Sequence, residues 1–285
     1  MESKIDLTGL VDTDRIVKVE TIDPAALPDR RGYLLVKRIA DVALSLTALT
    51  VLALPMALIA LAVKLDSPGP VFYRQERLGK NGKPFQLVKF RSMRTDAEKT
   101  GAQWAKEHDT RVTRMGRIMR ACRLDELPQF WGVVKGDLSL VGPRPERAVF
   151  YEAFEKYIPG FKQRLMVTPG ITGLAQVNGG YDLKPAEKIQ YDVEYIKHQS
   201  LGMDLSILLK TVAIVLLGTR GGGREGVEIR ILSVIRRISD CCGAIGEGLL
   251  DALPISLCQT GDGYCGCGRR IGLAGGAHGA DCGCY

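Results

Sequence analysis

Two adjacent carboxylates, Asp125 and Glu126, lie in the stretch RLDELPQFW, directly after a run rich in arginine. Neighbouring side chains on a helix point about 100° apart, so the two acids can take different roles. The arginines of the preceding run recur at every third residue, so they drift around a helix axis and do not form one stripe. Arg120 and Arg123 lie nearest to the acids and are the best candidates for binding an anion beside them.

Asp125 precedes a predicted helix that has Pro128 in its first turn, where proline is tolerated. Aspartate is a preferred helix N-cap, which would give Asp125 a structural role. The same position also favours anions, because the free N–H groups and the helix dipole attract negative charge. Arginine neighbours would keep the carboxylate ionised, as a nucleophile or a metal ligand requires. A cap and a chemical role both remain open for Asp125.

The residues around the acid pair favour phosphoryl chemistry. Arg144 stands between two prolines in the run GPRP, which presents its guanidinium for a bidentate phosphate contact. The chain contains neither a Gly-x-Ser-x-Gly nor a Walker sequence, so a serine hydrolase and an ATP-driven enzyme are not supported. Phosphoryl transfer needs positioning and charge neutralisation above all. The expected metal is Mg²⁺, held by one or two carboxylates and by the phosphates of the substrate.

The strongest hydrophobic signal is the segment 39–63, in which Asp41 is the only charged residue. About 20 apolar residues suffice to cross the ~30 Å core of a bilayer. Basic residues flank the segment on both sides, and positive charge favours the cytoplasm. Pro55 lies inside the segment, where it removes a backbone hydrogen bond and kinks a helix. A kinked helix that dips into the membrane and returns, and an ordinary single span, both remain open, with a buried core helix as the less favoured reading.

Composition points to an anionic partner without identifying it. The net charge of +7 suits nucleic acid, a phosphate-bearing substrate or a membrane surface. All but one of the 8 cysteines lie after residue 240, so the body of the chain is expected to face a reducing compartment.

Four segments are predicted along the chain. They are a polar lead-in at 1–36, a membrane helix at 37–64, a cytosolic catalytic domain at 65–217, and a Gly- and Cys-rich tail at 218–285. The tail is expected to lack regular structure or to be a non-native end. A metal site is its alternative, although the cysteine spacing does not match the usual zinc pairs.

The catalytic domain is predicted to contain one β-hairpin and several helices. Residues 67–93 form two strand-like stretches, and Asn81-Gly82 between them suits a tight turn with positive φ. The other predicted segments are amphipathic helices at 148–165 and 184–200, a Gly/Pro-rich loop at 167–180, and an apolar helix at 205–217. The last is too short to span a membrane and lies either at its interface or in the core. The expected fold class is therefore α+β, mainly helical and membrane-associated.

The chain resembles the bacterial sugar transferases, the monotopic polyprenyl-phosphate hexose-1-phosphate transferases, over residues 37–217. The likeness rests on five blocks in order: KRIADVALS, SPGPVFYRQERLGKNGKPFQLVKFRSM, RLDELPQFWGVVKGDLSLVGPRP, PGITGLAQVNGGYDL and MDLSILLKTV. The resemblance implies a membrane-dipping helix with both ends in the cytosol. It also implies transfer of a sugar 1-phosphate from a UDP-sugar to undecaprenyl phosphate with release of UMP, the first step of exopolysaccharide, capsule or O-antigen synthesis.

The resemblance also assigns roles to residues. Asp125 would attack and form a covalent phospho-sugar intermediate, with Glu126 assisting and both carboxylates contributing to Mg²⁺ binding. Phosphate contacts would come from Arg120 and Arg144, and Pro55 would break the membrane helix. Asp137 and Gln176 lie in matched blocks and are candidates for a substrate loop. Leu174 departs from the family, which commonly has tryptophan there, so the substrate contacts of that loop cannot be transferred.

The resemblance further implies a protein of the bacterial inner membrane with its catalytic domain facing the cytoplasm. The expected partners are a UDP-sugar, undecaprenyl phosphate, membrane lipids and a second copy in a homodimer, with no nucleic acid. The sequence does not identify the sugar. Two alternatives remain: an inactive membrane-anchored scaffold, and a basic module that binds lipid or nucleic acid.

Overall fold

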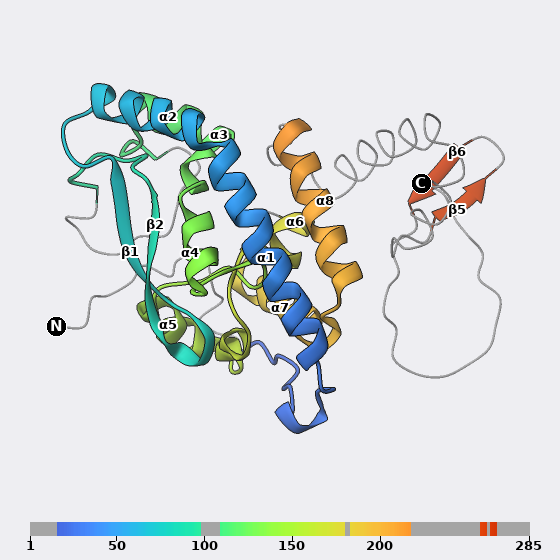
Figure 1. The fold of residues 1–285 in the computed structure, drawn as a ribbon. Helices are drawn as coiled ribbons and strands as arrows, with labels where there is room; N and C mark the ends of the chain where they lie inside the picture. The colour runs from blue at the N-terminus through green and yellow to red at the C-terminus, as the bar shows by residue number, and fades with distance from the viewer. Residues whose placement is uncertain (1–15, 98–108, 180–182, 218–256, 261–262, 267–285) are drawn as a thin grey trace, which may run out of the picture. The chain divides into compact units, whose positions relative to one another are not determined.

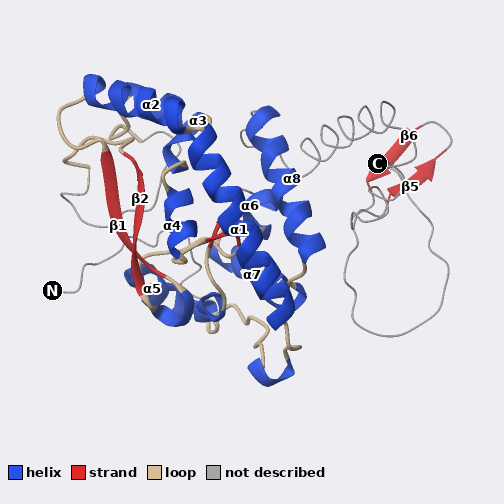
Figure 2. Cartoon of the chain, viewed as in Figure 1, coloured by secondary structure: helices blue, strands red, loops and turns tan. Residues whose placement is uncertain are grey.

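The computed structural model describes residues 16–97, 109–179, 183–217, 257–260 and 263–266, and the chain divides into two compact units, 1–235 and 236–285. Helices dominate the first unit, with a two-stranded hairpin beside them (Figures 1 and 2). Its helices are η1 (Pro24–Ala26), α1 (Arg31–Val51), α2 (Ala53–Asp66), η2 (Lys80–Gly82), α3 (Arg114–Ala121), η3 (Leu124–Glu126), α4 (Gln129–Lys135), α5 (Ala148–Tyr157), η4 (Phe161–Met166), α6 (Leu174–Gly179), α7 (Pro185–His198) and α8 (Leu201–Leu217). Its strands are β1 (Phe72–Leu78), β2 (Pro84–Phe90), β3 (Ser139–Val141) and β4 (Gly170–Thr172). A helix-dominated α+β fold with a small hairpin is thus confirmed.

The apolar segment forms two helices rather than one. α1 and α2 meet at Leu52 with a bend of 62°. Pro55 lies in the first turn of α2, and its ring would clash with the carbonyl of Val51 in a continuous helix. Among the described residues no single helix is long and apolar enough to cross a membrane, whereas this bent pair taken together is.

Polar side chains attach the first half of α1 to the rest of the unit. Lys37 forms an ion pair of 2.8 Å with Asp204 of α8. Asp41 accepts a 2.7 Å hydrogen bond from the hydroxyl of Ser139 in β3. Arg38 donates to two carbonyl groups near the end of α4, at 2.6 and 2.9 Å. The charged residue that interrupts the apolar segment is therefore buried against β3 and helps to position α1.

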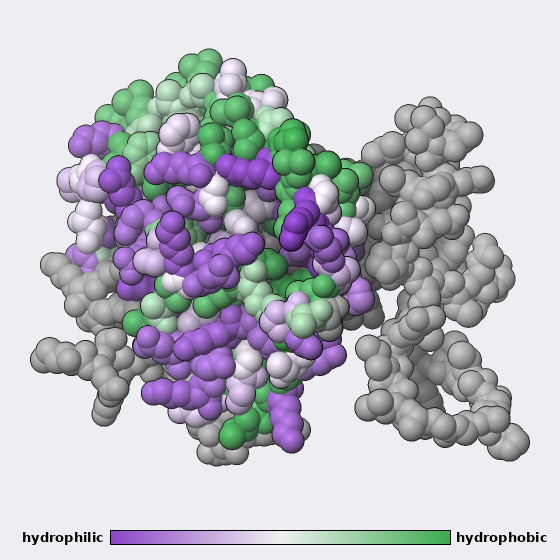
Figure 3. Space-filling model, turned by 60° about the horizontal axis from the view of Figure 1, so that its bottom comes forward, coloured by the Kyte–Doolittle hydropathy of each residue, from purple (hydrophilic) through white to green (hydrophobic). Residues whose placement is uncertain are grey.

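The second half of α1, α2 and α8 leave large hydrophobic side chains exposed. We call this set the apolar surface: Leu44, Leu46, Val51, Leu54, Leu58, Leu61 and Leu65 of α1 and α2, and Leu201, Leu205, Leu209, Val212 and Val215 of α8. Figure 3 shows hydrophobic residues gathered toward the top of the visible face, while polar residues cover much of the remainder. So much exposed apolar area marks a surface that contacts something other than water.

The β1–β2 hairpin confirms the prediction for residues 67–93. The strands are antiparallel, with Gln75 opposite Leu87, and Asn81 in the turn has the predicted positive φ of 57°. Side chains of β1 alternate in exposure, so Tyr73, Gln75 and Arg77 share the less exposed face. In Figure 1 the hairpin extends from the neighbourhood of α2 down to α5.

The Gly/Pro-rich stretch 167–180 is not a plain loop, and this part of the prediction was wrong. β4 pairs in parallel with β3, and α6 follows directly. A Cβ atom on Gly170 would lie 2.1 Å from the backbone nitrogen of Gly142, so glycine is what permits the two backbones to approach. Such a pairing depends on residues about thirty positions away, which local composition does not reveal.

The core beside the hairpin is built by α5, η4 and α7. Phe154, Ile158 and Ile196 are each 0% exposed. Buried within this core, Arg164 forms an ion pair of 2.6 Å with Asp192, and its guanidinium lies 4.9 Å from the centre of a phenylalanine ring. The predicted helix at 184–200 corresponds to α7 and is confirmed.

In the second unit, the described residues Leu257–Thr260 (β5) and Gly263–Gly266 (β6) form an antiparallel hairpin. The rest of the tail lies outside the described residues, so the predictions made for it stay predictions.

The ion pair in the core gives a test of folding energetics. Asp192→Ala leaves the guanidinium of Arg164 buried and uncompensated, so the free energy of unfolding is expected to fall by about 3–5 kcal/mol. Chemical unfolding of the purified protein measures this loss. Glu194→Ala, on the exposed side of the same helix, is the control and should change stability by less than about 0.5 kcal/mol. Equal losses in the two variants would contradict the assignment.

Candidate active site

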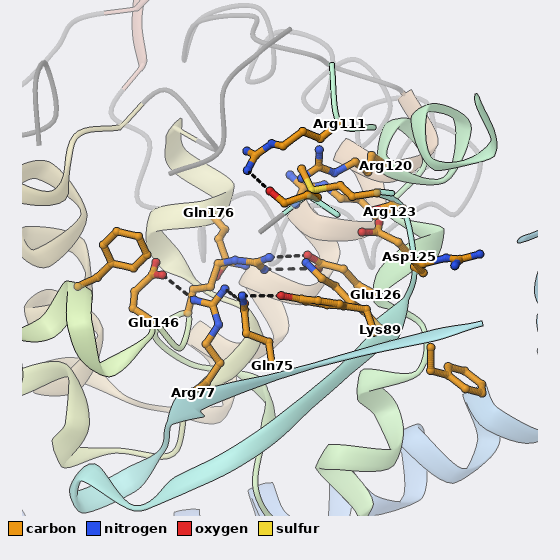
Figure 4. Close-up of a pocket in the computed structure, with 18 of the residues that line it drawn as sticks. Gln75, Arg77, Lys89, Arg111, Arg120, Arg123, Asp125, Glu126, Glu146 and Gln176 are labelled. Carbon is orange, nitrogen blue, oxygen red and sulfur yellow. Dashed lines mark hydrogen bonds and ion pairs between the residues drawn. The ribbon is translucent and has the colours of Figure 1, made fainter. Parts of the chain in front are cut away.

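A cavity of about 550 Å³ opens beside the hairpin and contains both carboxylates of the acid pair. It is lined from the inner face of β1 and β2, from α3 and η3, from the GPRP turn, and from α5, α6 and α7. Cationic side chains outnumber carboxylates in this lining, and they include Arg144 and the residues Lys89, Arg120 and Arg123 labelled in Figure 4. The cavity therefore suits a negatively charged ligand.

Asp125 is positioned by a sharp turn between α3 and α4. The hydroxyl of Thr113 caps the start of α3 by accepting a 2.9 Å hydrogen bond from Gly116. Arg123 then adopts a left-handed conformation with φ of 58°, which ends the helix and directs the chain into η3. Asp125 lies in this 3-10 turn and is 5% exposed.

The structure corrects the helix-cap explanation of Asp125. Pro128 occupies the N-cap position of α4, and no side chain caps that helix. Because proline at this point starts the helix with a fixed φ, the aspartate three residues earlier is left in the preceding turn. Asp125 is therefore available for chemistry and is not needed to cap the N-terminus of α4.

Glu126 is held by Arg144. One guanidinium nitrogen lies 2.5 Å from Oε1 and the other 3.4 Å from Oε2 of the carboxylate. The backbone carbonyl of Arg144 in turn accepts a 2.8 Å hydrogen bond from Arg164. Burial opposes the ionisation of Glu126, but the charge and hydrogen bonds of Arg144 prevail and hold the pKa of this carboxyl at about 2. Glu126 is thus an anion under ordinary conditions.

Asp125 experiences the opposite balance. Burial and the neighbouring charge of Glu126 raise the pKa of Asp125 above its ordinary value, while the cations Lys89, Arg120 and Arg144 act to lower it. The sequence predicted that arginines alone would keep this carboxylate ionised. Desolvation is the larger effect, so the cations offset it only in part.

A row of polar side chains forms the wall of the cavity on the hairpin side. Gln75 donates from Nε2 to the hydroxyl of Tyr73 at 3.0 Å and accepts at Oε1 from Arg77 at 2.6 Å. Arg77 also forms an ion pair of 2.9 Å with Glu146. Lys188 of α7 lines the same region.

Most of the sequence-predicted site residues come together in this cavity. Arg120, Asp125, Glu126, Arg144 and Gln176 all line it. The amide of Gln176 donates to a backbone carbonyl at 2.8 Å, which fixes its orientation.

Two of the predicted residues lie elsewhere. Asp137 follows α4 in a turn and is not among the residues that line the cavity. Pro55 lies at the bend between α1 and α2. Neither contributes a side chain to the cavity itself.

Two groups of lining residues were not predicted from the sequence: the polar wall of Gln75, Arg77, Glu146 and Lys188, and Lys89 beside Asp125. The signal was present in part, because Tyr73, Gln75 and Arg77 alternate along a predicted strand and must share one face. That the shared face lines a cavity depends on the packing of α5 and α7, which alternation alone does not predict.

The carboxylates of the acid pair suit Mg²⁺ as part of a coordination shell that other ligands complete. Within the described residues there is no group of three or more His, Cys, Asp or Glu side chains that could hold a metal ion. Asp125 and Glu126 together offer carboxylate oxygens, and Mg²⁺ is commonly held by one or two carboxylates while phosphates and water complete its shell. A substrate-assisted site is therefore compatible with these residues.

Comparison with known proteins identifies the class. The bacterial sugar transferase family matches residues 32–218. The UDP-N-acetylgalactosamine-undecaprenyl-phosphate N-acetylgalactosaminephosphotransferase of Aeromonas hydrophila is 44% identical over 189 residues, covering 65% of this chain and 45% of that protein. The UDP-glucose:undecaprenyl-phosphate glucose-1-phosphate transferase of Caulobacter vibrioides is 41% identical over 212 residues, covering 72% of this chain and 79% of that protein.

A third relative, the exopolysaccharide production protein PSS of Rhizobium leguminosarum, is 43% identical over 200 residues, covering 67% of this chain and 98% of that protein. The chain thus spans less than half of the Aeromonas relative and nearly all of the Rhizobium one. The family match covers more than half of the present chain. This chain belongs to the bacterial sugar transferase family.

Proposed function

We propose that this protein transfers a sugar 1-phosphate from a UDP-sugar to undecaprenyl phosphate, as the initiating step of a surface polysaccharide. The observation that carries the proposal is the buried Asp125 beside the Glu126–Arg144 ion pair, in a cation-lined cavity of about 550 Å³. The names of the Aeromonas and Caulobacter relatives describe this type of reaction with two different sugars. The two relatives thus share the type of reaction and differ in the sugar that they transfer.

In the proposed mechanism, a carboxylate oxygen of Asp125 attacks the phosphorus that bears the sugar. A bond forms between this oxygen and phosphorus, and the bond to the bridging oxygen breaks, so UMP leaves with the electron pair. A phosphate oxygen of the lipid then attacks the same phosphorus, the bond to Asp125 breaks, and the carboxylate is restored. No external proton donor is needed for either displacement at neutral pH, because phosphates are the leaving and entering groups.

The surrounding residues supply charge neutralisation for both displacements. The guanidinium of Arg120 forms no hydrogen bond or ion pair with a described residue, so it is available to a phosphate. Arg144 is oriented by Glu126, and Lys89 adds positive charge beside Asp125. Mg²⁺ held by Asp125 and Glu126 would further neutralise the phosphates when bound.

The apolar surface supports a membrane location for the proposed lipid reaction. The bend at Leu52 and the basic residues on both flanks favour a helix pair that enters and leaves the cytoplasmic face of the inner membrane. α8 would then lie in the interface with its exposed leucines in the lipid. This arrangement places a lipid-borne phosphate on the same side of the unit as α2. Assembly into a homodimer stays a prediction.

The nucleophile assignment predicts the behaviour of Asp125→Asn. Because an amide oxygen cannot replace the attacking carboxylate, UMP release from a UDP-sugar in the presence of undecaprenyl phosphate should fall at least about a thousandfold. A mass-spectrometric search for a sugar-phosphate adduct should find it on the wild-type residue and not on the variant. Asp29→Asn, an exposed position before α1, is the control. Full turnover in Asp125→Asn would refute the assignment.

The electrostatics predict a pH effect of Lys89→Gln. The reactive form of Asp125 is ionised, so kcat/KM falls as the pH drops through its pKa. Lys89 acts to lower this pKa, so removing its charge raises the pKa and moves the acid limb of the kcat/KM profile to higher pH. The control is Lys83→Gln in the exposed hairpin turn, whose profile should match the wild type. A shift to lower pH would contradict the argument.

The proposed topology predicts that both flanks of the helix pair lie in the cytoplasm. In a variant whose native cysteines are replaced by serine, Lys18→Cys precedes α1 and Lys80→Cys follows α2. Neither should react with a membrane-impermeant maleimide in intact spheroplasts, and both should react after permeabilisation. Labelling of one site alone from outside would indicate a full span.

A further inference from the structure

The cavity has two ends of different chemistry. One end carries guanidinium groups of Arg111, Arg120 and Arg123, contributed by α3 and its flanking segments. The other end carries the polar wall of Arg77, Gln75 and Glu146. Figure 4 shows the three arginines on one side of Glu126 and the polar wall on the other. A ligand that fills the cavity therefore meets cations at one end and mixed donors and acceptors at the other.

The polar wall is a connected and largely fixed array. The hydrogen bonds run from Tyr73 through Gln75 and Arg77 to Glu146, with distances of 3.0, 2.6 and 2.9 Å. Arg77 also donates to the backbone carbonyl of Pro145 at 3.1 Å. Because each side chain is held by its neighbour, the array presents a set pattern of polar atoms and loses little freedom when a ligand binds.

Two buried donors at this end have no partner among the described residues. They are Nε of Arg77 and Nη1 of Arg164, and both residues line the cavity. Arg164 itself is 3% exposed. Buried N–H groups are rarely left unpaired in native proteins, so these two point to a ligand that accepts hydrogen bonds here.

The charge at this end does not suit a second phosphate. Arg77 is paired with Glu146, and Arg164 is paired with Asp192, so most of the positive charge is already compensated. Lys188 is a further cation in this part of the lining, and burial lowers the pKa of its amine. A carboxylate acceptor beside amide, guanidinium and amine donors matches an uncharged polyol, whose hydroxyl groups both donate and accept.

The proposed order of the two displacements also indicates that the sugar lies away from the arginine end of the cavity. In an in-line reaction the leaving UMP and the entering lipid phosphate both lie opposite Asp125, so they use the same end of the cavity. α3, which carries Arg120, packs against α2 of the apolar surface. The arginine end is therefore the end that a lipid phosphate can reach, and the sugar has to occupy another part of the cavity.

We propose that Gln75, Arg77, Glu146 and Lys188 form the subsite for the sugar ring of the donor, and that Gln75 and Glu146 determine which arrangement of hydroxyl groups is accepted. This assignment rests on the proposed transferase function. It identifies specificity-determining residues that do not take part in the displacement at phosphorus.

The test compares Gln75→Leu and Glu146→Gln with the wild type. The rate of UMP release is measured with UDP-glucose, UDP-galactose and their N-acetylamino counterparts, and the affinity for UDP is measured by calorimetry. For the preferred donor, kcat/KM should fall about tenfold in Gln75→Leu and about tenfold to a hundredfold in Glu146→Gln. The ratio between that donor and its epimer should shrink, because the discriminating hydrogen bond is gone. Affinity for UDP, which lacks the sugar, should stay within about twofold.

Gln86→Leu is the matched control, because it makes the same change on the exposed face of the same hairpin. It should leave donor preference and UDP affinity unaltered. An unchanged donor ratio in both test variants, or an equal loss of UDP affinity, would overturn the subsite. If Glu146→Gln does not fold, as judged by its melting curve, Gln75→Leu decides alone.

Failure of the proposed function has a different signature. If the wild type releases no UMP from any donor, the transferase proposal fails, and the subsite is then judged by binding. A UDP-sugar should bind more tightly than UDP to the wild type, and Gln75→Leu should remove the difference. Equal affinities of the wild type for UDP and every UDP-sugar would refute the subsite.

Discussion

A buried carboxylate can act as a nucleophile only while it carries its charge, so the nucleophilic role proposed for Asp125 depends on the charges that surround it. Burial favours the protonated form and so does the neighbouring Glu126. The Glu126–Arg144 ion pair reduces the second effect, because the guanidinium lies against the competing carboxylate at 2.5 Å. Lys89 and Arg120 then supply the positive charge that burial makes necessary. A substrate that brings its own phosphates would alter this balance, because its negative charge adds to that of the two carboxylates.

The cations reach Asp125 from separate parts of the chain, and the fold is what brings them together. Lys89 comes from β2, Arg120 from α3 and Arg144 from the turn after β3. The approach of α3 to the end of the hairpin is close enough that a Cβ on Gly116 would lie 2.0 Å from the carbonyl oxygen of Ser92. The turn after β3 is held by its pairing with β4 and by the hydrogen bond from Arg164. The buried core of α5, η4 and α7 thus contributes directly to the position of Arg144.

The features of the fold and the site that were predicted are those encoded by residues close together in the sequence. The hairpin, the bend near Pro55 and the helix at 184–200 are encoded by residues adjacent in sequence, and all three are confirmed. The grouping of Arg120, Asp125, Glu126 and Arg144 was predicted from motifs, and the structure brings them to one cavity.

The parts that escaped prediction depend on distant contacts. The β3–β4 pairing requires two glycines about thirty residues apart, and the segment around Gly170 looks like a loop when taken alone. The position of Asp125 in a turn depends on the left-handed Arg123, a conformation that a non-glycine side chain seldom adopts. The polar wall was missed because alternation along β1 shows which residues share a face but not what that face covers.

The polar contacts of α1 fix the position of the apolar surface relative to the cavity. Lys37 is paired with Asp204, and Asp41 accepts a hydrogen bond from Ser139, so the helix can neither slide nor rotate without burying an unpaired charge. Ser139 begins β3, whose other end leads into the turn that carries Arg144. The distance between the exposed leucines and the arginines proposed to bind phosphate is therefore set by paired polar groups. A lipid whose chain is held at that surface would present its phosphate at a defined depth, which is the geometric condition for the second displacement proposed at Asp125.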